Sequence, residues 1–110
     1  MKYKGRDSMA EWQIRYFREA KKDLARLDHS QQILVTKAIR KVSQNPLPQT
    51  EGGYGKPLRG ALANLLKIKL RDAGLRVVYR LVRTEHAMQI IVISIRSDDT
   101  VYKLAEQRLN

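Results

Sequence analysis

Residues 65–82 have the residue pattern of a β-hairpin. Polar and apolar side chains alternate strictly from Leu66 to Arg71, and successive side chains of a strand point to opposite faces. The segment Leu75–Val82 is rich in β-branched residues and predicts the returning strand, with Asp72-Ala73-Gly74 as the turn. The first strand is therefore expected to place its basic residues on one face and its aliphatic residues on the other: Lys67, Lys69 and Arg71 against Leu66, Ile68 and Leu70.

The face on which Arg76 lies depends on the length of that turn. A two-residue loop of Ala73 and Gly74 would place Arg71 opposite Arg76 and Lys69 opposite Val78, and Arg76 would then join the lysine face. A three-residue loop would pair Arg71 with Leu75 and send Arg76 to the other face. Cations on adjacent strands repel each other, so a face that gathers them is expected to bind an anion. Solvated surface charge is the alternative interpretation.

The segments before the hairpin predict a strand and two helices. Residues 12–17 alternate as a strand with three apolar side chains on one face, namely Trp12, Ile14 and Tyr16. Residues 18–27 predict an amphipathic helix with Ala20, Leu24 and Leu27 inward and Lys21, Lys22, Asp23 and Arg26 on the opposite side. Residues 31–44 predict a second helix capped by Asp28 or Ser30, whose apolar stripe is Leu34, Val35, Ala38, Ile39 and Val42.

The remaining segments complete an α+β fold. Residues 47–60 are rich in proline and glycine and predict a long loop. Residues 88–95 are apolar at alternate and intervening positions, which predicts a central strand buried on both faces, after a turn at residues 84–86. Asp98 or Asp99 is expected to cap a last helix that runs to Arg108. The predicted order is β-α-α-β-β-β-α, with a small antiparallel sheet, a helical hairpin and a C-terminal helix.

Composition favours a polyanionic partner. The chain has 110 residues, which suits a single domain over residues 12–110 after a flexible leader of residues 1–11. Its 22 basic and 11 acidic residues give a formal charge of +11, which attracts nucleic acid or an acidic protein. The absence of cysteine excludes thiolate chemistry and fits a reducing compartment. Since no apolar run approaches the roughly 20 residues of a membrane span, we expect a soluble, cytoplasmic protein without a membrane partner.

The candidate chemistry requires neither a metal nor another cofactor. His29 and His86 are isolated in sequence, and no third ligand accompanies Asp98 and Asp99. The remaining lysine, arginine and tyrosine side chains suit RNA cleavage, in which a ribose 2′-hydroxyl attacks the adjacent phosphate. Arginine matches two phosphate oxygens at once, and a lysine among other cations titrates below its reference value of ~10.4 and can serve as a base. The candidates are Lys67, Lys69, Arg71, Arg76, Arg96 and Tyr102.

Five segments resemble the RelE branch of the RelE/ParE toxin superfamily of bacterial type II toxin-antitoxin systems. They are residues 56–60 (KPLRG), 66–71 (LKIKLR), 74–79 (GLRVVY), 92–96 (VISIR) and 101–105 (VYKLA). The most specific feature is the lysine pair followed by an arginine seven residues after its second lysine. The resemblance covers roughly residues 12–109. It implies a ribosome-dependent mRNA endonuclease that cuts the codon in the decoding site and is inhibited by an acidic antitoxin.

The resemblance also implies roles for individual residues. Lys69 would be the base, Lys67 and Arg76 would contact the scissile phosphate, and Arg96 would face the leaving oxygen. Tyr102 would stack on a base or assist proton transfer; an ordinary half-buried helix residue is the alternative for it. We expect further RNA contacts from the other basic residues of the loop and hairpin, Lys56, Arg59, Arg71 and Arg80.

Two departures from the family pattern precede and follow Arg96. Ser94-Ile95 stands where the family has a glycine and a basic residue, and residues 97–100 (SDDT) replace further cations. Two other functions stay open: a ParE-like poison of DNA gyrase, and a basic module that binds RNA or an acidic protein without catalysis. The paired strand lysines favour the nuclease over the gyrase poison, because the ParE branch generally lacks them.

Overall fold

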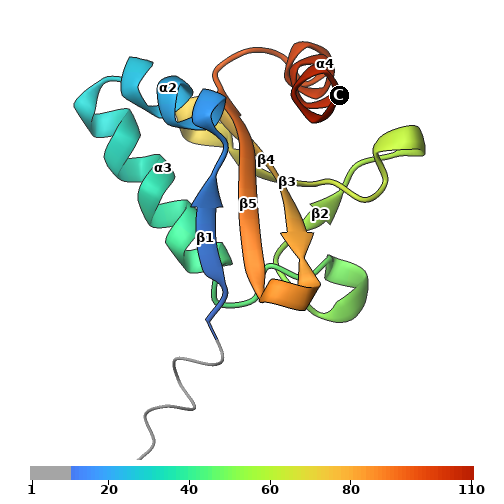
Figure 1. Ribbon diagram of the computed structural model, residues 1–110. Helices are drawn as coiled ribbons and strands as arrows, with labels where there is room; N and C mark the ends of the chain where they lie inside the picture. Colours follow the sequence, from blue (N-terminus) through green and yellow to red (C-terminus); the bar gives the residue numbers. More distant parts are fainter. Residues whose placement is uncertain (1–10) are drawn as a thin grey trace, which may run out of the picture.

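A computed structural model describes residues 11–110, which form one five-stranded sheet with helices on both faces (Figure 1). The leader predicted for residues 1–11 lies outside the described residues, except for Glu11. The strand order is β1-β5-β4-β3-β2, where β1 is Gln13–Tyr16, β2 is Lys56–Pro57, β3 is Leu66–Leu70, β4 is Leu75–Val82 and β5 is Ala87–Ser94. The helices are α2 (Arg18–Arg26), α3 (His29–Val42) and α4 (Asp98–Leu109). Among residues 11–110, no helix has the length and apolar character to span a membrane.

The sheet confirms the predicted α+β class and adds one short strand. β3, β4 and β5 form the expected antiparallel meander, and β1 lies parallel to β5, which is therefore an inner strand. Strand β2 lies in the segment predicted as a loop and pairs Lys56 with Lys67 and Pro57 with Leu66. β2 lies at the edge of the sheet, which agrees with its proline, because a residue without an N–H is tolerated in a sheet mainly at an edge.

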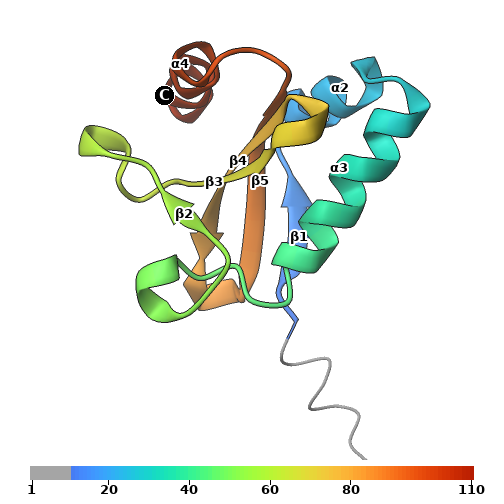
Figure 2. The same cartoon turned by 180° about the vertical axis from the view of Figure 1, so that it is seen from behind.

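Each face of the sheet carries its own hydrophobic cluster, and α4 lies across the sheet from α2 and α3 (Figure 2). β5 contributes to both clusters because its side chains alternate between the faces, and a β-bulge shifts that alternation partway along the strand. Tyr79 pairs with Ile90 and Val78 with Val92, so that Ile91 is an extra residue in β5. Ile91 and Val92 consequently pack in the cluster beneath α4, whereas Ile90 packs in the cluster beneath α2 and α3. The predicted burial of this strand on both faces is confirmed.

The β3-β4 turn differs from both predicted registers. Lys69 pairs with Arg76 and Leu70 with Leu75, so the loop has four residues. It consists of a 3-10 turn, Arg71–Ala73, followed by Gly74 at φ +66°. A two-residue loop of the type that suits a hairpin demands positive φ at both positions or at the first, which alanine resists. The four-residue loop requires it at Gly74. Arg71 therefore lies in the turn and not on the strand face, which corrects its predicted position.

The helix ends and faces also differ in detail from the predicted pattern. Asp28 caps α3 as expected and forms a capping box with Gln31, so the helix begins two residues earlier than predicted. Leu34, assigned to its buried stripe, is 48% exposed. Asp23 of α2 was predicted to face solvent and is buried, because Arg108 and the N–H of Ile93 both donate to its carboxylate.

A buried tyrosine connects the sheet to the loop that leads to β2. Tyr79 of β4 donates a hydrogen bond of 2.8 Å to the carbonyl oxygen of Pro46, and burial raises the pKa of its hydroxyl. A Cβ on Gly55 would lie 2.4 Å from that hydroxyl, so the close approach of the loop requires glycine. This contact places the loop directly before Lys56, which carries the first cation of the site described next.

Candidate functional site

The ladder of β2, β3 and β4 brings four cations to one face of the sheet. Residues directly opposite each other on neighbouring strands share a face. Lys56 is opposite Lys67, and Lys69 is opposite Arg76, while alternation along β3 places Lys67 and Lys69 together. The predicted convergence of the strand lysines with the hairpin arginine is therefore present, through a register that the sequence pattern did not give.

Helix α4 brings Tyr102 to the same face. The Nζ atom of Lys67 donates a hydrogen bond of 3.0 Å to the hydroxyl of Tyr102 and lies 5.7 Å from the centre of its ring. The second distance lies within the range of a cation-π interaction. Both side chains are half-buried. Residues separated by 35 positions in sequence thus form one contact between β3 and α4.

An aspartate completes the site in a place where the sequence predicted a helix cap. Ser97 is the N-cap residue of α4, and Asp98 lies inside its first turn. The Nζ atom of Lys69 lies 2.9 Å from Oδ2 of Asp98, and Nε of Arg76 donates to its Oδ1. The hydrogen bond from Lys69, followed by that from Arg76, lowers the pKa of Asp98 below its ordinary value. Asp98 is therefore a charged partner of two candidate catalytic residues.

Arg96 meets the site through its backbone. The carbonyl oxygen of Arg96 accepts a hydrogen bond of 2.8 Å from Nη1 of Arg76. Arg96 itself is exposed. This bond fixes the plane of the Arg76 guanidinium. The structure therefore brings Lys67, Lys69, Arg76 and Tyr102 into contact with one another or with Asp98, whereas Arg96 joins them by its carbonyl.

The residues predicted to bind RNA lie around this centre at different places. Arg59 is exposed and precedes the 3-10 turn Gly60–Leu62. Arg71 is exposed in the hairpin turn beside Lys69. Arg80 is farther along β4, where its Nε donates to Gln89 at 2.7 Å and its guanidinium lies 5.6 Å from the ring centre of Phe17.

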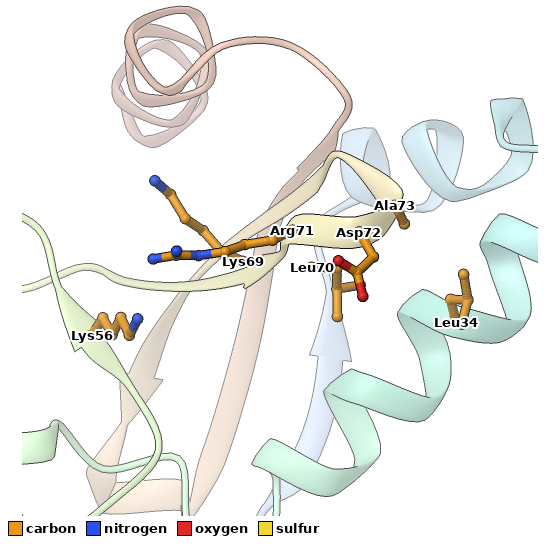
Figure 3. A pocket seen from close by; sticks show the side chains of 7 residues that line it. All are labelled: Leu34, Lys56, Lys69, Leu70, Arg71, Asp72 and Ala73. Carbon is orange, nitrogen blue, oxygen red and sulfur yellow. The ribbon is translucent and has the colours of Figure 1, made fainter.

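An open cavity of about 620 Å³ borders the site at the end of β3 (Figure 3). Lys69 extends from β3 on the side of α4, while Leu70 leaves the strand on the opposite side. Leu34 of α3 forms the far wall, which explains why this leucine stays exposed. The lining combines three cations with apolar and acidic side chains: Lys56, Lys69 and Arg71 with Leu34, Leu70, Asp72 and Ala73.

The sequence contained one signal for the position of Asp98. Ser97 is as good an N-cap residue as aspartate, and a cap at Ser97 places Asp98 one residue inside the helix. The ion pairs of Asp98 could not be predicted, because they depend on the register of β3 and β4 and on the position of α4 over the sheet.

The chemistry available to this site is the binding and reaction of anions. One ammonium group and one guanidinium hold a carboxylate between them, and a second ammonium group contacts a phenol on the same partly exposed face of the sheet. Within the part of the chain that the structure describes, no group of three or more histidine, aspartate or glutamate side chains gathers as metal ligands. A phosphodiester is an anion of suitable size for such donors.

The known proteins similar to this chain include RelE-like toxins. No family model matches the chain. A curated Escherichia coli protein named as a RelE-like toxin is 29% identical over 99 residues, which cover 89% of this chain and 97% of that protein. The structure of a double mutant of the E. coli toxin RelE in the free state aligns with a TM-score of 0.75 at 23% identity, covering 91% of this chain and 99% of that one.

A second solved structure agrees. A chain of a RelBE toxin-antitoxin complex from Mycobacterium tuberculosis aligns with a TM-score of 0.67 at 26% identity, covering 84% of this chain and 99% of that one. These alignments extend over nearly the whole of each relative. In sequence the chain is therefore similar to a RelE-like toxin, and it has the fold of the RelE structures, in agreement with the resemblance seen in the strand lysines and the segments around them.

Proposed function

We propose that this chain is the toxin of a type II toxin-antitoxin system and cuts mRNA in the decoding site of the ribosome without a metal ion. The observation that carries the proposal is the convergence of Lys67, Lys69, Arg76 and Tyr102 on one face of the sheet. These groups supply positive charge and proton-transfer capacity at the place where a phosphodiester would bind.

The reaction requires one bond to form and one to break at phosphorus. The ribose 2′-oxygen attacks and loses its proton to a base, for which Lys69 is the candidate. The bond from phosphorus to the 5′-oxygen breaks, and that oxygen takes up a proton as a 2′,3′-cyclic phosphate remains on the upstream fragment. Lys67 and Arg76 would stabilise the charge on the phosphate, and Arg96 would approach the leaving oxygen. Tyr102 would stack on a base or assist proton transfer.

The partners follow from charge and from the relatives. A net charge of +11 favours association with ribosomal RNA and mRNA, and Lys56 and Arg71 at the cavity would hold the phosphates flanking the cut. Arg59 and Arg80 would extend this basic surface. The M. tuberculosis relative was solved as a toxin-antitoxin complex, and an E. coli RelE mutant was solved with a peptide of the antitoxin RelB. We infer that an acidic antitoxin binds this chain as well.

The proposal is tested with purified protein, programmed ribosomes and a defined mRNA. We expect cleavage at the codon in the decoding site and upstream fragments that end in a 2′,3′-cyclic phosphate. An mRNA with a 2′-deoxynucleotide at the cut position should stay intact, and RNA without ribosomes should be cut far more slowly. Intact mRNA on ribosomes, combined with inhibition of DNA gyrase in a supercoiling assay, would replace the proposal with a gyrase poison.

A further inference from the structure

Asp98 occupies the position where the lysine-arginine pair would bind a substrate anion. Its two oxygens are divided between two donors, with Oδ2 facing Nζ of Lys69 at 2.9 Å and Oδ1 accepting from Nε of Arg76. Two non-bridging oxygens of a phosphodiester could be held by the same pair of donors. The three side chains are between 26% and 32% exposed, so an incoming anion can reach them.

The carboxylate of Asp98 is directed at the two cations of the sheet. Ser97 is the N-cap residue of α4 and its hydroxyl lies 3.2 Å from that of Thr100. An acidic side chain in a first turn does interact favourably with the helix dipole, but Asp99 is in the same turn, carries the same charge and is exposed. What distinguishes Asp98 from Asp99 is its pair of contacts with the two cations.

We propose that Asp98 is an internal competitor for substrate, so that an RNA phosphate binds Lys69 and Arg76 by displacing its carboxylate. This inference rests on the proposed function, since it assigns regulation to the same site. The two donors would therefore become available to the phosphate only as the carboxylate moves away from them.

The test compares Asp98→Asn with Asp99→Asn as a matched control. Both variants remove one negative charge from the same helical turn. Asp99 makes neither of the contacts that Asp98 makes with Lys69 and Arg76. The probe is a short RNA in which every 2′-hydroxyl is methylated, so that it binds without being cut, and the measurement is its dissociation constant by fluorescence anisotropy. We expect roughly tenfold tighter binding for Asp98→Asn and a change below about twofold for Asp99→Asn.

Repeating the measurement without Lys69 shows whether a gain in RNA affinity arises from the contact between Asp98 and Lys69. In a Lys69→Ala background, the gain in affinity from Asp98→Asn should be smaller, because one of the two competing contacts is already lost. Equal gains for the two aspartate variants, weaker binding by Asp98→Asn, or an undiminished gain without Lys69 would each overturn the proposal. If the asparagine variant does not fold, as judged by circular dichroism, Asp98→Ser provides the same comparison.

The binding readout separates this inference from the proposed function. Tighter binding by Asp98→Asn without any mRNA cleavage on ribosomes would support a displaceable carboxylate and reject the nuclease. Cleavage that depends on the strand lysines, with no effect of Asp98→Asn on binding, would support the nuclease and reject the competitor.

Discussion

Asp23 and Arg108 show how one buried pair holds the last helix to the rest of the molecule. The guanidinium of Arg108 donates to both carboxylate oxygens of Asp23, at 2.6 and 3.1 Å, and also to the carbonyl of Ile91 at 2.8 Å. The N–H of Ile93 donates to the same carboxylate at 3.0 Å. The pair thus connects α2, the bulged strand β5 and α4, the helix that carries Asp98 and Tyr102.

This pair could not be predicted from sequence, although both residues could be placed on helices. A helical pattern assigns a charged residue to the solvent side by default, because charges are rarely buried unless paired. The partner of Asp23 lies 85 positions away, and no local periodicity contains that information. The shared face of Lys67 and Lys69 was predictable for the opposite reason, since alternation along one strand fixes which of its side chains share a face, whereas the face of Arg76 depended on the turn.

Replacing Asp23 by alanine is expected to destabilise the protein by about 3 kcal/mol, because Arg108 then keeps a largely buried charge without its carboxylate. The measurement is the free energy of unfolding in urea. Glu106→Ala removes an exposed carboxylate from α4 and should change that value by no more than about 0.5 kcal/mol. Equal stability of the two variants would show that the pair contributes nothing beyond a surface charge.

Elements were easier to predict than the way they join. The β3-β4 hairpin was clear from alternation, whereas its register depends on the conformation of four residues in which Gly74 takes positive φ. The bulge at Ile91 could not be predicted either. Residues 90–94 are all apolar or small, so the sequence gives no sign of where an extra residue enters the strand. Helix ends with a strong cap, such as α3 at Asp28, were located to within two residues.

The cap of α3 predicts a dependence of stability on pH. The N–H of Gln31 and the hydroxyl of Ser30 donate to Asp28 and lower its pKa below the ordinary value. A group whose pKa is lower in the folded state stabilises that state above its unfolded pKa of about 3.9 and loses the contribution as pH falls through the folded value. We therefore expect the stability advantage of the wild type over Asp28→Asn to be constant near neutral pH and to shrink in acid.

The measurement is urea unfolding of both proteins between about pH 6 and pH 2. Other titrating groups, including Asp98, are common to the two proteins and cancel in the difference. An advantage that stays constant over the whole range, or grows on acidification, would contradict the assignment of Asp28 as a charged cap.

At the scale of the whole molecule, the two faces of the sheet differ in composition. The face beneath α2 and α3 is occupied by the larger hydrophobic cluster, while the face beneath α4 combines a second cluster with the cationic site. The order of the main elements, and the covering of both faces of the sheet, were predictable because each long strand and helix has a clear period. The position of α4, and with it Asp98 beside Lys69 and Arg76, required the three-dimensional structure.

The most direct test of the central claim is the rate of mRNA cleavage on programmed ribosomes by the Lys67→Ala, Lys69→Ala double variant. Its matched control is the Lys21→Ala, Lys22→Ala double variant, which loses the same charge from exposed positions on α2. If the β3 lysines act on the scissile phosphate, the first variant should be slower by at least about 100-fold and the control unchanged within about threefold. Undiminished cleavage by the folded β3 variant, or equal losses in both variants, would contradict the proposed site.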